Sequence, residues 1–259
     1  MKPKCHPASH AHAGTRPVSA GSEPGLALQR GPRAVNRVYG GRAMAELKAE
    51  RRERLMNAAY ALIGREGYAR LSIERTCAAA RVATRHYYEH FQGREALLHG
   101  LFDRVEAELW QAVTRALTEP GVETGERSGA AIRAFVRHAL SDPIRARIMC
   151  LESVGVSAEL EEKRRRLIRR FAELIHQVSR QLAADGVLPA ADYRLSGIAL
   201  VGATNELLVE WISGGMRLTV EEMELQVLNI FRALTKGAVY AHAEAALPHV
   251  PHAADRALA

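Results

Sequence analysis

The chain has 259 residues, 47% of them hydrophobic, which allows one large or two modest domains with real cores. No run approaches 18 uncharged apolar residues, so we expect no membrane span, and the N-terminus has no apolar signal core that would direct export. The three cysteines (Cys5, Cys77, Cys150) are widely spaced, which favours a reducing cytoplasm over a disulfide framework. The net charge is +7, with 18 Lys and Arg against 9 Asp and Glu in residues 1–104 and 18 against 20 in residues 105–259, which favours a polyanion contact at one end only.

Residues 1–43 are rich in Pro, Gly, Ser, Ala and Arg and show no apolar periodicity, so we predict a disordered basic tail. Met44 opens a sequence that immediately has helical character. Two interpretations of the tail stay open with equal weight. Either Met44 is the true start and residues 1–43 are an upstream over-read, or the tail is a basic arm that touches DNA.

A first helix is predicted over about 47–65, ending before Gly67. Its apolar residues fall on one stripe at i, i+3, i+4, i+7 and i+8: Leu55, Ala58, Ala59, Leu62 and Ile63. Ser72 is the expected N-cap of a second helix over about 73–79. A short third helix follows over about 83–89, and a fourth runs from Arg94 to about Leu117.

After a loop at 119–129, only helical patterns follow. We expect helices at about 129–140, 143–153, 158–184, 192–213 and 220–243, and a flexible tail over 244–259. No period-2 strand pattern is visible. The sequence therefore predicts an all-α protein with a three-helix helix-turn-helix domain over 45–104 and a larger helical domain over 105–243.

The segment Val82-Ala83-Thr84-Arg85-His86-Tyr87-Tyr88-Glu89-His90-Phe91-Gln92-Gly93-Arg94-Glu95 resembles the DNA-binding part of the TetR/AcrR family of bacterial transcription regulators. A looser resemblance, at 142–161, is to actinobacterial members of the family. In such a helix-turn-helix the second helix enters the major groove of DNA. The resemblance implies a transcription regulator rather than an enzyme, with no cofactor and no metal.

The start of the third helix carries side chains that base edges accept. Thr84, Arg85 and His86 are our candidates for reading bases. Tyr88 and His90 match positions of the family that contact the DNA backbone. Arg94 lies at the start of the fourth predicted helix, where its positive charge and the free N–H groups of the helix N-terminus can both contact phosphate. We therefore predict one DNA-binding set: Ser72, Thr84, Arg85, His86, Tyr88, His90 and Arg94.

The segment departs from the family pattern at the turn and in the second helix. Arg81 replaces the usual Gly, so we expect a strained or differently shaped turn. Ala83 replaces a capping Ser or Thr, which passes the capping role to Thr84. Thr76 and Cys77 replace the usual Ile-Ala. We expect Tyr87 to pack inward with Val82 and Phe91.

Two alternatives to a regulator stay open. His86-x-x-Glu89-His90 matches the inverted zinc-protease pattern, which would make a zinc-dependent hydrolase, although no third ligand or long supporting helix is evident. A helical interaction protein with a degenerate helix-turn-helix is the other alternative.

The helix predicted over 158–184 carries the basic run Lys163–Arg170, which we interpret as a solvated face. Glu161 pairs with Arg165 and Glu162 with Arg166 at i,i+4. The opposite face is an apolar stripe: Leu160, Leu167, Ile168, Phe171, Leu174, Ile175, Val178 and Leu182.

The last two predicted helices suit a four-helix interface with a symmetry mate, as the family resemblance also implies. We therefore expect a homodimer that binds a palindromic operator on double-stranded DNA, most simply as a repressor released by a hydrophobic small-molecule effector. Pocket candidates by residue type are Trp110, Phe135, Met149, Cys150, Phe171, His176, Asn205, Glu206 and Trp211.

Overall fold

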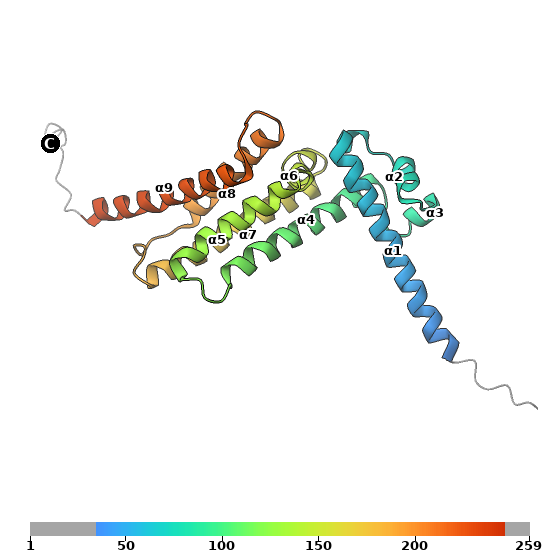
Figure 1. Cartoon of the computed structure of the whole chain (residues 1–259), viewed down its shortest axis with the longest axis horizontal. Coiled ribbons are helices and arrows are strands. Elements are labelled where there is room, and N and C mark those ends of the chain that lie inside the picture. Colours follow the sequence, from blue (N-terminus) through green and yellow to red (C-terminus); the bar gives the residue numbers. More distant parts are fainter. Residues whose placement is uncertain (1–34, 247–259) are drawn as a thin grey trace, which may run out of the picture. The chain divides into compact units, whose positions relative to one another are not determined.

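The structure is a computed structural model that describes residues 35–246, with side chains described for 43–237 apart from residue 124. Within this range every regular element is a helix, which confirms the all-α prediction (Figure 1). Of the tails predicted over 1–43 and 244–259, residues 1–34 and 247–259 lie outside the described residues, and residues 244–246 are helical rather than a flexible tail.

The N-terminal part contains α1 (Val35–Glu66), a 3₁₀ turn (Tyr68–Arg70), α2 (Ile73–Ala80), α3 (Thr84–Tyr87) and α4 (Arg94–Leu117). The predicted bounds of α2 and α4 agree with the structure to within a residue. The start of α1 differs, because it begins at Val35 rather than near 47, so that 35–43 of the predicted disordered tail is helical. Extending an existing helix needs no new nucleus, which lets it continue through a segment without apolar periodicity.

The C-terminal part contains α5 (Thr124–Ser141), α6 (Pro143–Arg147), a π-helical turn (Ile148–Glu152), α7 (Ala158–Ala184), α8 (Arg194–Ile212) and α9 (Val220–Ala246). Two predictions here were wrong in detail. The loop predicted over 119–129 ends at Glu123, the N-cap of α5, and the helix predicted over 143–153 is split into α6 and the π turn. The wider π turn buries three consecutive residues, Ile148, Met149 and Cys150.

Helix α7 packs against α8, α4 against α5, and α5 against α9 (Figure 1). The α7–α8 contact depends on Gly197, since a Cβ there would lie 2.7 Å from the carbonyl oxygen of Ala172. Helices α5 and α9 are joined by a bidentate ion pair in which Arg137 donates to the almost fully buried Glu224 at 2.9 and 3.0 Å.

The predicted solvated face of α7 is present in part, because Arg165, Arg166, Arg169 and Arg170 are exposed whereas Lys163 and Arg164 are half-buried. Glu161 lies 3.7 Å from Arg165, and Glu162 lies 3.9 Å from Arg166. Of the predicted apolar stripe, Leu160, Leu167, Phe171 and Leu182 are buried and the other four are half-buried.

Helix α8 is the one helix in the described range that has the length and hydropathy to cross a bilayer. Our expectation of no membrane span was based on uncharged runs, and α8 carries Glu206 and Glu210. Its inner side packs on α7 and α9, while Leu195, Ile198 and Gly202 on another side are exposed.

Candidate nucleic-acid interface and effector cavity

The turn between α2 and α3 is built around Arg81, the one non-glycine residue of the described range with positive φ (φ 52°, ψ 46°). The Arg81 N–H donates to the Ala78 carbonyl (3.2 Å), and the Val82 N–H donates to the Cys77 carbonyl (3.0 Å). These two bonds form a Schellman motif, in which glycine usually occupies the left-handed position. The expected strain at Arg81 is therefore present, and the turn keeps the ordinary shape.

Changing Arg81 to glycine is expected to raise the free energy of unfolding by about 0.5–1 kcal/mol. The left-handed penalty of about 1–2 kcal/mol exceeds the extra entropy that glycine loses on folding, about 0.5–1 kcal/mol. Urea titration measures the change. In Arg65→Gly, at an exposed position in the last turn of α1, the same titration should show a loss of up to about 1 kcal/mol, and equal losses in both variants would contradict a strained turn.

The two unusual residues of α2 fit its buried side. Thr76 is fully buried, and its hydroxyl donates to the Ser72 carbonyl at 2.8 Å, so no polar group is left without a partner. Cys77 is also buried, which raises the pKa of its thiol. Ser72 is the N-cap of α2, as predicted, and its Oγ accepts from the Arg75 N–H at 3.2 Å. The Ser72 side chain is thus already engaged in capping.

Helix α3 is shorter than the prediction of 83–89 and has no side-chain cap. Its N-cap is Ala83, and the expected transfer of capping to Thr84 does not occur. Tyr87 holds the helix instead. Its ring is fully buried between Val82 and Phe91, as predicted, and its hydroxyl donates to the Gly93 carbonyl at 2.9 Å. A buried aromatic ring with a satisfied hydroxyl gives this short helix a fixed position.

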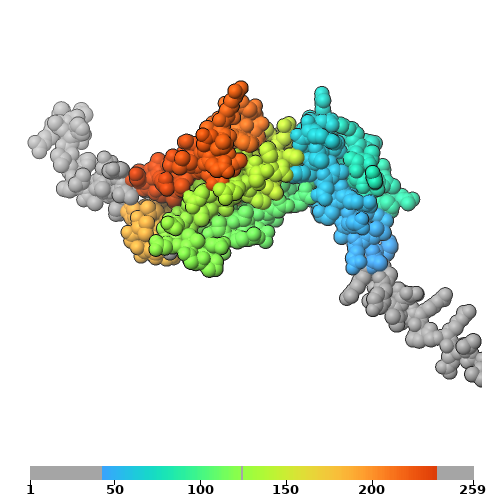
Figure 2. Space-filling view, in the orientation of Figure 1, coloured from blue at the N-terminus to red at the C-terminus, as the bar shows by residue number. Residues whose placement is uncertain are grey.

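Opposite Tyr87, two of the three predicted base-reading side chains, Thr84 and Arg85, face solvent. Tyr88, predicted to contact the DNA backbone, is 58% exposed. His86 is half-buried, with Nδ1 2.7 Å from Glu89 and Nε2 3.3 Å from Arg85 Nε. The hydrogen bond to His86 holds the pKa of Glu89 below its usual value. In Figure 2 this segment, in turquoise, forms part of the outer surface.

Two predicted backbone-contacting residues, Arg94 and His90, are partly engaged or partly buried within the protein. Arg94 donates one N–H to the Leu71 carbonyl at 2.7 Å and stacks over the Tyr68 ring at 5.3 Å, although its side chain is otherwise exposed. His90 is half-buried, and its Nε2 has no hydrogen-bond partner among the described residues. Burial lowers the pKa of His90, and the positive charges of Lys48 and Arg52 lower it further, while the Glu89 carboxylate opposes this shift.

Sequence reasoning missed the basic residues of α1 that act on the turn following α3. Lys48 and Arg51 act electrostatically on both Glu89 and His90, which places them near the end of the reading segment. Arg52 stacks over the Phe91 ring at 5.3 Å. The three-residue spacing of Lys48 and Arg51 on a helix was the available signal.

The zinc-protease pattern is not arranged as a ligand set. Helix α3 ends at Tyr87, so His86 lies on the helix and His90 lies beyond it in the following turn. His86 and Glu89 pair with each other. The three side chains that could share a metal in the described part of the chain are instead Glu95, His99 and Glu159.

Two hydrogen bonds join the N-terminal helices to the segment 142–152. The Tyr60 hydroxyl donates to Asp142 at 2.7 Å, and the Tyr68 N–H donates to Glu152 at 2.8 Å. Arg147 donates to the same Glu152 at 2.7 Å. The π turn that ends at Glu152 therefore contacts the 3₁₀ turn that precedes α2 directly.

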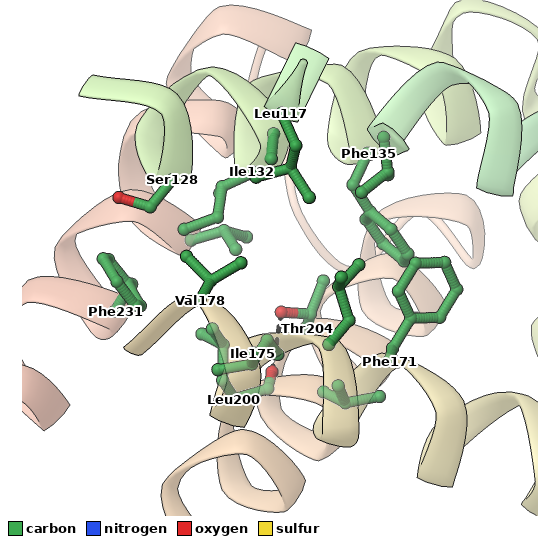
Figure 3. A pocket seen from close by; sticks show the side chains of 15 residues that line it. Leu117, Ser128, Ile132, Phe135, Phe171, Ile175, Val178, Leu200, Thr204 and Phe231 are labelled. Carbon is green, nitrogen blue, oxygen red and sulfur yellow. Dashed lines mark hydrogen bonds between the residues drawn. The ribbon is translucent and has the colours of Figure 1, made fainter. Parts of the chain in front are cut away.

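An apolar cavity lies among α4, α5, α7, α8 and α9, with about 640 Å³ of empty space that includes some open solvent (Figure 3). The rings of Phe135 and Phe171 meet edge to face at 5.3 Å on one side. Ser128 and Thr204 are its polar lining residues, and the Thr204 hydroxyl donates to the Leu200 carbonyl at 2.7 Å. The cavity therefore suits an apolar chain or ring.

A second, smaller cavity shares Phe135, Phe171 and Val201 with the first. Its wall adds Arg164 and Asn205, so it offers a cation and an amide. Met149 and Cys150 of the π turn also line it. Burial raises the pKa of Cys150 to about 12, which leaves its thiol protonated and poorly reactive.

Five of the pocket candidates line these cavities: Phe135, Met149, Cys150, Phe171 and Asn205. Four line neither one, because their polar groups are engaged elsewhere or face solvent. His176 accepts from the Tyr193 N–H at 3.2 Å, Trp211 donates to the Leu218 carbonyl at 2.7 Å, and Glu206 is exposed. The Trp110 ring lies under the Arg170 guanidinium at 3.6 Å.

Two family models match the chain. The model described as bacterial regulatory proteins of the tetR family matches residues 55–101, and the tetracyclin repressor-like C-terminal domain matches residues 121–235. No curated protein sequence matched the chain.

Solved structures share the fold at low identity. FadR, a fatty acid degradation regulator from Bacillus halodurans, is 19% identical with a TM-score of 0.63, over 72% of this chain and 95% of that one. FadR from Bacillus subtilis in complex with stearoyl-CoA is 18% identical with a TM-score of 0.59, over 71% and 98%. AibR in complex with isovaleryl coenzyme A and operator DNA is 18% identical with a TM-score of 0.56, over 70% and 97%.

Proposed function

Because the chain belongs to the TetR family of DNA-binding transcription regulators, we propose that it is a cytoplasmic homodimeric repressor that a hydrophobic effector releases from a palindromic operator. The observation that carries this proposal is the pairing of an exposed reading face with an apolar cavity in one chain. Thr84, Arg85 and His86 read bases, while Tyr88, His90 and Arg94 contact the DNA backbone together with Ser72.

The dimer forms through α8 together with α9. Leu195 is 79% exposed and Ile198 49% exposed, and Ala199 and Gly202 continue the same side of α8. A Cβ on Gly202 would meet nothing within 4 Å, so this apolar side is open to a second copy. Leu225 of α9, 50% exposed, adds to it.

The effector carries an acyl chain or a comparable apolar group. The larger cavity offers almost no free hydrogen-bonding capacity, and its two phenylalanine rings favour aliphatic or aromatic contact. Two neighbours in fold were solved with stearoyl-CoA and isovaleryl coenzyme A. Arg164 and Asn205 of the adjoining cavity supply polar contacts for the other end of such a molecule.

Effector binding is transmitted through the π turn. Met149 and Cys150 line the smaller cavity, and Glu152, in the same turn, accepts from the Tyr68 N–H. A ligand that favours a different position of this turn alters the support of the reading segment in each subunit. Release then requires that the effector bind the DNA-free geometry more tightly than the DNA-bound one.

Titration of the protein–operator complex with acyl-CoA esters of increasing chain length tests the proposal. Fluorescence anisotropy of labelled operator DNA should fall as the ester is added, and free coenzyme A should have no effect. If no ester lowers the anisotropy, or if esters raise it, an acyl-responsive repressor is excluded.

Changing Val178 to tryptophan should weaken binding of the active ester at least about 10-fold, because the half-buried Val178 side chain lines the larger cavity and an indole would fill it. Isothermal titration calorimetry measures the change, and operator affinity without ester should stay the same. Arg180→Trp, at an exposed position two residues along α7, is the matched control and should bind ester normally. Equal binding by both variants would place the ligand elsewhere.

A further inference from the structure

The first turns of α4 and α7 bring together three side chains of the kind that bind metal ions. Glu95 and His99 lie one turn apart on α4, and Glu159 lies in the first turn of α7. One ligand atom from each lies within 4.8 Å of the other two. One imidazole nitrogen and two carboxylate oxygens make a donor set that divalent transition-metal ions accept.

The spacing within this group fits one ion. His99 Nε2 lies 3.5 Å from Glu95 Oε1. Two ligands about 2.0–2.2 Å from a tetrahedral Zn²⁺ ion are separated by roughly this distance. Two carboxylates with a neutral imidazole also balance a divalent charge.

His99 provides an independent observation. Its side chain is 15% exposed, its Nε2 is buried, and this atom has no hydrogen-bond partner among the described residues. The nearest charged group to this atom is the Glu95 carboxylate on the same helix, whose Oε1 lies 3.5 Å away. A buried imidazole nitrogen beside a carboxylate, with a second carboxylate in the same cluster, is a position that a metal ligand can occupy.

The two carboxylates are not neutralised by a neighbouring lysine or arginine in the part of the chain that the structure describes. Within the described range, neither Glu95 nor Glu159 has a Lys or Arg partner within 4.0 Å, whereas many other carboxylates of the chain do.

From this geometry we propose that Glu95, His99 and Glu159 bind one divalent transition-metal ion, with Zn²⁺ as the expected occupant and water as the fourth ligand. Glu95 and His99 lie within the stretch that matches the DNA-binding family model, and Glu159 lies within the stretch that matches the C-terminal one. A bound ion therefore links α4, next to Arg94, to α7 of the effector-binding part.

Zinc titration of the untagged full-length chain against a chromophoric chelator tests the site. The chain also carries Cys5, His6, His10 and His12, which can bind metal independently. The proposed site is therefore measured as the difference in bound zinc per chain between the wild type and a variant. Glu159→Gln and His99→Gln should each lose one equivalent, with affinity at least about 100-fold weaker. Glu159 is exposed, so its variant keeps the fold even if the His99 variant does not.

Hydrogen exchange separates a bridging ion from an incidental one. In the wild type, zinc should slow amide exchange in the first turns of both α4 and α7, and in Glu159→Gln it should slow neither. His138→Gln, which removes another histidine with a buried and unpartnered Nε2, is the matched control and should behave as wild type. Full zinc binding by Glu159→Gln, or protection confined to one helix, would overturn the proposal.

Discussion

Replacing Arg85 with alanine is expected to abolish preference for the operator while leaving affinity for unrelated DNA almost unchanged. Arg85 is exposed at the start of α3, and Tyr87, two residues further on, fixes the helix in the core. A bidentate arginine–guanine contact is worth about 1–3 kcal/mol. Two subunits would lose about 2–6 kcal/mol together, which is roughly a 30-fold to 10⁴-fold loss of operator affinity.

Competition binding with operator and scrambled duplexes at one salt concentration measures this ratio. Arg165→Ala, an exposed arginine on α7, is the control for removing one positive charge, and it should keep the wild-type preference. If Arg85→Ala weakens both duplexes equally, Arg85 contacts phosphate rather than bases.

A charge on the open side of α8 should separate the dimer. Gly202→Arg places a guanidinium on the apolar side formed by Ile198 and Ala199, and the free subunit has room for it. Sedimentation should change from twice the chain mass to the 28.4 kDa of one chain. Operator affinity should fall about 10²–10⁴-fold, because each reading segment then binds its half-site alone.

Gly125→Arg is the matched control for this substitution. Gly125 is also exposed, its Cβ would meet nothing within 4 Å, and it lies in the first turn of α5. It should remain dimeric with normal operator affinity. A Gly202→Arg variant that still sediments as a dimer would show that α8 is not at the centre of the interface.

Local signals in the sequence predicted much of the fold. The Ser72 cap bounds α2, and Arg94 to Leu117 form one helix because apolar residues recur along it at helical spacing, on both sides of Gly100. These local signals gave wrong helix boundaries where tertiary contacts determine the structure. Gly125 and Gly129 have the character of a loop, yet they lie in α5, whose buried face packs on α4 and α9.

Some features of the candidate site were also predictable from the sequence, and others were not. The inward position of Tyr87 follows from the apolar spacing of Val82, Tyr87 and Phe91, and the strain at Arg81 follows from residue type. The contact from Arg94 to the Leu71 carbonyl spans 23 residues, and no sequence pattern reveals it. Pocket candidates chosen by type included His176 and Trp211 because their backbone partners are visible only in three dimensions.

Selection of bound sequences from a random duplex DNA library tests the central claim most directly, since every possible operator competes in the same experiment. The wild-type chain should enrich an inverted repeat with half-site centres about one helical turn apart, roughly 10 base pairs, and Arg85→Ala should lose the enriched bases at matching positions of both half-sites. Enrichment of no sequence by the wild type, or of the same repeat by both proteins, would contradict the assignment of residues 84–86 as the part that reads DNA.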